Sequence, residues 1–61
     1  MSLATLEKAI VFEAIKVSGI KTLKRKDLME WRTGKDNKLE VREGEKLFYL
    51  PSLGLECVFK I

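Results

Sequence analysis

Histidine is absent from this 61-residue sequence, and cysteine, proline and tryptophan each occur once. With no histidine and Cys57 as the only cysteine, the chain forms neither an intramolecular disulfide nor a Cys/His zinc site. The usual Ser-His and Cys-His nucleophilic pairs are also excluded, because both need an imidazole base. We therefore predict a non-enzymatic protein without a metal site or a cofactor.

Long apolar runs are also missing. Glu7, Lys8 and Glu13 interrupt the apolar N-terminal stretch, so it reaches the length of neither a signal-peptide core nor a membrane span. The four glycines are isolated, and none precedes the Gly-Lys-Ser/Thr sequence of a phosphate-binding loop. An unpaired thiol fits a reducing compartment. These features predict a cytoplasmic protein with no membrane partner and no evident small-molecule substrate.

What the chain does contain is typical of a folded domain, since hydrophobic residues make up 46% and charged residues 34%. Its length allows one domain, residues 1–61, near the lower limit at which a chain buries enough apolar surface to fold alone. A second copy or a larger partner is therefore an expected source of additional stability.

The first predicted element is a helix over residues 3–17. Ser18-Gly19 ends it, because glycine readily adopts the left-handed conformation that closes many helices. Val11, Phe12 and Ile15 lie outside its buried stripe, so the helix is apolar on more than one side. The stripe follows helical spacing and consists of Leu3, Leu6, Ile10, Ala14 and Val17.

Residues 20–34 predict a second, short helix with Leu23, Leu28 and Trp31 facing inward. Thr22 is one candidate for its N-cap. That start would place three cations, at residues 24–26, at the positive end of the helix dipole. Asp27, with Glu30 three residues later, is the better-charged alternative.

After residue 37 the apolar residues alternate, which predicts strands over 38–42, 46–50 and 55–61. Glu43-Gly44 is suited to the first hairpin turn, and the Pro51–Gly54 segment separates the second strand from the third. We therefore expect an α+β domain in which two N-terminal helices pack on a three-stranded antiparallel meander.

An alternative interpretation makes residues 38–50 a third helix, at a cost of about 1 kcal/mol for Gly44 in its interior. Helix, Ser-Gly turn, helix and C-terminal hairpin, in that order, resemble a winged helix-turn-helix domain. The resemblance implies DNA binding. The meander interpretation departs from it, because it has no third helix to enter the major groove.

Basic side chains are concentrated in residues 16–38, where eight stand against three acidic ones and give a local charge of +5. Such an excess attracts polyanions, of which nucleic acid is the commonest. The candidate phosphate contacts are Lys21, Lys24, Arg25, Lys26, Arg32 and Lys35.

A protein interface or self-association as a homodimer is the other hypothesis, and the one we rank first. Alternation places Leu47 and Tyr49 toward the helices and leaves an apolar sheet face on the other side. We expect a small regulatory module that binds a protein partner or a second copy through these surfaces. Its candidate interface residues are Val11, Phe12, Ile15, Phe48, Leu50 and Val58.

Overall fold

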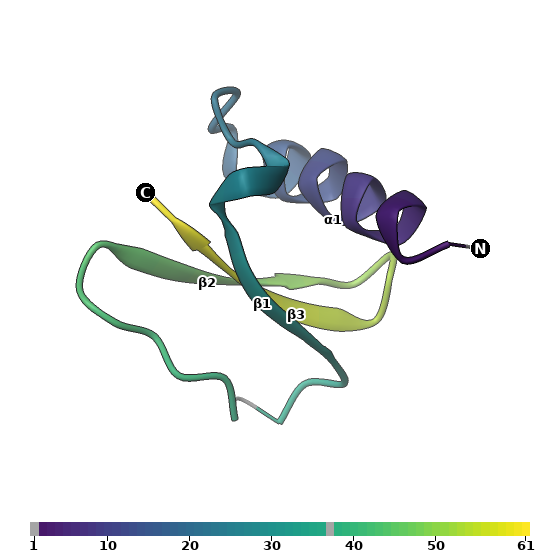
Figure 1. Cartoon of the computed structure of the whole chain (residues 1–61). Helices are drawn as coiled ribbons and strands as arrows, with labels where there is room; N and C mark the ends of the chain where they lie inside the picture. The colour runs from purple at the N-terminus through teal and green to yellow at the C-terminus, as the bar shows by residue number, and fades with distance from the viewer. Residues whose placement is uncertain (1, 37) are drawn as a thin grey trace.

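The computed structural model describes residues 2–36 and 38–61, and it contains one long helix packed on a three-stranded antiparallel sheet (Figure 1). The α+β class is therefore confirmed. In chain order the elements are α1 (Leu3–Ser18), the 3-10 helix η1 (Arg25–Asp27), β1 (Leu28–Thr33), β2 (Glu45–Leu50) and β3 (Leu55–Lys60).

Helix α1 covers the predicted residues and ends at the predicted glycine. Ser2 caps it, because its Oγ accepts a hydrogen bond from the backbone N–H of Thr5 at 3.2 Å. At the other end Gly19 has φ 76°, and its N–H donates to the Ile15 carbonyl at 2.8 Å. The prediction of a helix over residues 3–17 is confirmed to within one residue.

The predicted second helix is wrong. Residues 20–24 are turn and loop, η1 is a single turn, and residues 28–33 form β1. The Asp27 carboxylate accepts the Lys24 N–H at 3.1 Å and so closes the turn. Three consecutive cations disfavour a helix start here, while Trp31 and Thr33 favour a strand. Packing against β3 decided between these weak preferences.

The sheet order is β1–β3–β2, so the chain's last strand lies in the middle. The hairpin of β2 and β3 and the antiparallel pairing are as predicted, but the simple meander is wrong. Residues 38–42 form no strand beside β2, and the third strand of the sheet is instead β1, on the other side of β3. The alternative third helix is also wrong, since residues 45–50 are β2, and with it the winged-helix resemblance fails.

The connection from β1 to β2, which we call the strap (residues 34–36 and 38–44), passes beneath the sheet on the face opposite α1 (Figure 1). Lys35 Nζ lies 5.1 Å from the centre of the Tyr49 ring on this lower face. Val58 and Glu56 are buried there, although α1 covers only the upper face. The strap therefore gives the sheet a second cover.

The core lies between α1 and the upper face of the sheet. Phe59 and Phe48 meet edge to face, with ring centres 5.9 Å apart. Trp31 and Leu28 of β1 pack at the margin of this core, which agrees with their predicted inward orientation. The buried members are Ile10, Ala14, Leu23, Phe48, Leu50, Leu55, Cys57 and Phe59.

Candidate functional site

Three of the predicted interface residues are buried inside the chain. Phe48 and Leu50 face α1, and Val58 is fully enclosed on the lower face, the side on which the strap lies. The predicted assignment of the β2 faces is inverted: Leu47 pairs with Val58 and Tyr49 with Glu56, so both point to the lower face. The expectation that Phe48, Leu50 and Val58 form an exposed face is wrong, because the alternation does not say which face the helix covers.

The three predicted interface residues on α1 differ in exposure. Val11 and Ile15 are half-buried and pack against the core. Phe12 points outward with 61% of its surface exposed, and Lys16 Nζ lies 5.1 Å from its ring centre. The second apolar side of the helix therefore mostly serves the domain's own core.

The predicted phosphate contacts fall into two groups. Lys21, Lys24, Arg25 and Lys26 lie in the connection that leads into β1, whereas Arg32 and Lys35 lie at the far end of that strand. At about 3.3 Å per residue, β1 separates the groups by roughly 20 Å. The structure therefore does not bring the six residues into one surface.

The fold adds two other cations to the first group. Lys46 is the second residue of β2, and Lys60 is the last residue of β3. Phe59 of β3 pairs with Lys46 on one side and with Leu28, which follows η1 directly, on the other, so these cations lie at the η1 end of the sheet. We call this set the basic end: Lys21, Lys24, Arg25, Lys26, Lys46 and Lys60. All six are exposed, and Arg25 Nε forms an ion pair with Glu7 Oε1 at 3.3 Å. Charge counting along the sequence missed Lys46 and Lys60 because they join the group only through strand pairing.

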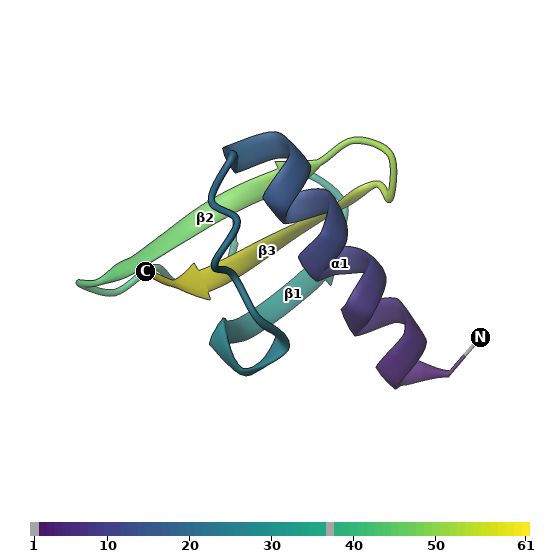
Figure 2. The same ribbon diagram turned by 90° about the horizontal axis from the view of Figure 1, so that it is seen from above.

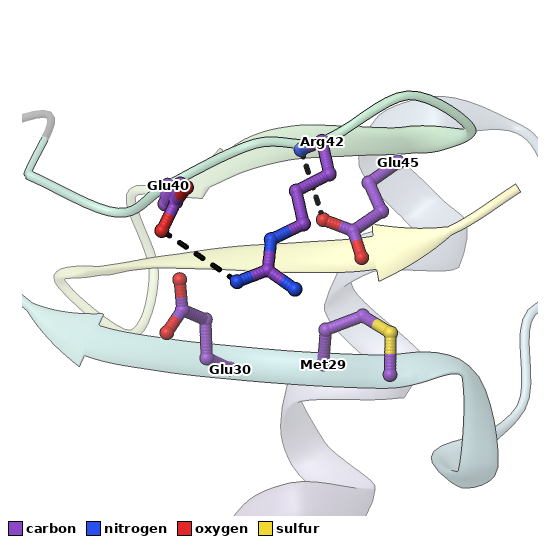
Figure 3. A pocket seen from close by; sticks show the side chains of 5 residues that line it. All are labelled: Met29, Glu30, Glu40, Arg42 and Glu45. Atoms are coloured by element: carbon purple, nitrogen blue, oxygen red, sulfur yellow. Dashed lines mark hydrogen bonds and ion pairs between the residues drawn. The ribbon is translucent and has the colours of Figure 1, made fainter.

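A hollow of about 270 Å³ opens on the lower face between β1, β2 and the strap (Figure 3). Met29 and Glu30 project into it from β1, while Glu40 and Arg42 come from the strap. Arg42 Nη2 lies 3.8 Å from Glu40 Oε2, and the Arg42 backbone N–H donates to Glu45 Oε1 at 3.0 Å. Both contacts are local and lie within residues 40–45, where the strap leads into β2. Within residues 2–36 and 38–61 no cluster of acidic or cysteine side chains fits a metal ion.

Cys57 lies in the central strand with no exposed surface. Burial raises the pKa of its thiol from 9.0 to about 12, which outweighs a smaller lowering by a hydrogen bond with the Phe48 backbone. The thiolate is the reactive form of cysteine. Cys57 is therefore a small core residue of the central strand.

The outer edge of β2 has a regular backbone. Gly44 lies opposite Ile61, and the Gly44 carbonyl accepts a hydrogen bond from the Ile61 N–H at 2.8 Å. In an antiparallel pair every second residue is hydrogen-bonded to its partner, so the bonded positions continue at the even-numbered residues of β2. The backbone groups of Lys46, Phe48 and Leu50 consequently point to β3. Those of Leu47 and Tyr49 point away from it, along the open edge.

The two edges of the sheet differ in ways that affect pairing with another chain. The β1 edge carries a register irregularity between Leu28 and Glu30, and it alternates charged with apolar side chains. Bulges and charges are how native sheets protect their edges. The β2 register runs without interruption from Glu45 to Leu50 and ends in four consecutive apolar residues. The β2 edge is thus the unprotected one, and we take it as the candidate site.

Comparison with protein-family models, with curated proteins and with solved structures finds no match to the chain. In the part of the chain that the structure describes, no helix combines the length and the apolar character needed to cross a membrane. Function is therefore inferred from the chain's own surfaces.

Proposed function

We propose that the protein is a small, non-enzymatic regulatory module of the cytoplasm that binds a protein partner through the edge of β2. The observation that carries the proposal is the regular row of outward backbone groups at Leu47 and Tyr49 on an edge without a bulge. An extended segment that pairs with such an edge gains main-chain hydrogen bonds, and side chains at alternate positions supply specificity.

The side chains around this edge support the proposal. Leu47 and Tyr49 are half-buried on the lower face, so each keeps apolar surface for a partner to cover. On the upper face the C-terminal end of α1 crosses above β2 (Figure 2). An added strand would therefore meet apolar surface on both faces, and burial contributes about 25 cal/mol per Å² of apolar area.

Proline substitutions at matched positions test the proposal. Tyr49→Pro removes an outward N–H from the β2 edge, and Thr33→Pro removes one from the β1 edge. The Thr33 N–H points outward because the N–H of the next residue, Gly34, points inward and donates to the Gly54 carbonyl at 2.9 Å. Proline is tolerated at edge positions whose N–H faces solvent. We expect both variants to fold by circular dichroism and only Tyr49→Pro to lose association at least tenfold, measured by sedimentation or by pull-down of the native partner.

Leu47→Lys serves as the second variant, because a lysine protects an edge without changing the backbone. If Tyr49→Pro and Leu47→Lys both stay folded and associate like the unchanged protein, the β2 edge is not the binding site.

Nucleic-acid binding is a second candidate function, and the basic end favours it. The fold gathers cations from the connection before β1, from β2 and from β3 at one end of the molecule. These side chains can contact phosphates but offer no aromatic platform for bases, so binding would be independent of sequence. Arg32 and Lys35 lie too far away to share this surface.

A charge-reversal pair tests this second candidate. The double variant Lys24→Glu, Lys26→Glu is expected to abolish binding to a short DNA duplex in a fluorescence-anisotropy titration at low salt. Arg32→Glu with Lys35→Glu makes the same charge change at the other end of β1 and should weaken binding much less. Each phosphate contact contributes about 0.9 to the slope of log affinity against log salt concentration. Equal losses in both double variants would mean that net charge, not the basic end, attracts the DNA.

A further inference from the structure

We infer that the strand which pairs with β2 is β2 of a second copy of this chain, related by a two-fold axis at Leu47 perpendicular to the sheet. This inference rests on the proposed function, because it names the partner of that edge. The result is one continuous six-stranded sheet in the order β1–β3–β2–β2–β3–β1, with a helix α1 from each copy on the same face.

Symmetry restricts how β2 can meet itself. Two antiparallel strands related by a two-fold axis within one sheet need that axis to be perpendicular to the sheet, so residues opposite each other point to the same face. In β2 the odd-numbered residues point to the lower face and carry the outward backbone groups. An axis at Leu47 satisfies both conditions.

This register uses the outward groups fully. Leu47 exchanges a pair of main-chain hydrogen bonds with Leu47 of the other copy, and each Tyr49 N–H meets the Glu45 carbonyl across the seam. The Glu45 N–H is already bonded to the Arg42 carbonyl at 3.0 Å, so it needs no further partner. An axis at Tyr49 would instead place Leu47 opposite Pro51, which has no N–H to donate.

Side chains in this register are compatible. Lys46 is opposite Phe48, Glu45 is opposite Tyr49, and no residue meets a like charge. Opposite-charge and mixed aromatic pairs stabilise cross-strand contacts, whereas like charges directly opposite destabilise them. The self-complementarity of β2 is what selects a second copy over an unrelated strand.

Val17 supplies apolar surface above the seam. It lies one helical turn after Glu13, whose Oε2 accepts a hydrogen bond from Ser52 at 2.9 Å just beyond β2. Residues four apart share a side of a helix, so Val17 faces the β2 side of α1, and 53% of its surface is exposed. The two-fold axis brings both Val17 side chains toward the same seam and accounts for their exposure in the single copy.

Disulfide trapping of the full chain tests the inference. Opposed residues in a hydrogen-bonded antiparallel pair have Cα atoms about 5.5 Å apart, which suits a disulfide. Leu47→Cys is therefore expected to form a covalent dimer under mild oxidation, seen on a non-reducing gel, and the unchanged protein to stay monomeric there because Cys57 is buried. Sedimentation equilibrium should show a dimer before oxidation.

Three other results would overturn the inference. If Tyr49→Cys forms the covalent dimer and Leu47→Cys does not, the two-fold axis lies at Tyr49. If a covalent dimer forms only when the Leu47→Cys and Tyr49→Cys proteins are mixed, the axis lies at Phe48. If the protein sediments as a monomer and none of these cysteine variants forms a covalent dimer, there is no β2 dimer. If that monomer still loses a native partner on Tyr49→Pro substitution, the second copy is rejected while the binding edge stands.

Discussion

Val58→Glu is expected to leave the protein unfolded at 25 °C. Val58 has no exposed surface, and it lies on the central strand between Glu30 and Leu47, on the lower face where the strap passes. A carboxylate forced into this position without a partner costs roughly 4 kcal/mol or more. Stabilities of about 0.05–0.15 kcal/mol per residue give a 61-residue chain only about 3–9 kcal/mol in total. Far-ultraviolet circular dichroism should show loss of the sheet and helix signals.

The matched control is Val41→Glu, which makes the same change in the strap, where valine is 45% exposed. Surface substitutions of this kind usually change stability by less than about 0.5 kcal/mol. A folded Val58→Glu protein would show that the strap does not enclose the lower face in solution, and Val58 would then return as a candidate interface residue.

Phe59→Ala carries the second-largest expected effect, a loss of about 3–5 kcal/mol in the free energy of unfolding. The Phe59 ring is fully enclosed, and it contacts Phe48 edge to face beneath α1. Removing it deletes apolar contacts and leaves a cavity that the surrounding core can only partly fill. Urea unfolding followed by circular dichroism should therefore give a much lower midpoint, or no folded baseline at all.

Phe12→Ala removes the same side chain from the outer face of α1. Only its exposed contact with Lys16 is lost, which contributes at most about 1 kcal/mol. Similar losses in the two variants would mean that the Phe12 ring is covered in solution, and the outer face of α1 would then be an interface as well.

Local patterns predicted the elements that a few neighbouring residues decide. Gly19 ends α1, Gly44 (φ 82°) turns the chain into β2, and the Pro51–Gly54 segment separates β2 from β3. In each case a cap, a positive φ or a proline acts within one turn of the chain.

What the sequence could not predict depends on distant partners. Residues 28–33 have the apolar spacing of a short helix, yet they extend because β3, more than twenty residues later, offers a strand to pair with. Which face of β2 the helix covers is also a tertiary choice, so Phe48 and Tyr49 were assigned to the wrong sides. The open β2 edge could be found only after the strand order was known.

The central place of β3 also determines when this chain can fold during its synthesis. Neither β1 nor β2 has a neighbour until residues 55–60 are present, because both pair with β3 and not with each other. While the ribosome still holds those residues, the emerging chain can form only α1 and local turns, and the apolar β2 segment has no partner of its own. Folding must therefore follow the release of this last strand, and early termination before Leu55 yields a chain with no sheet at all.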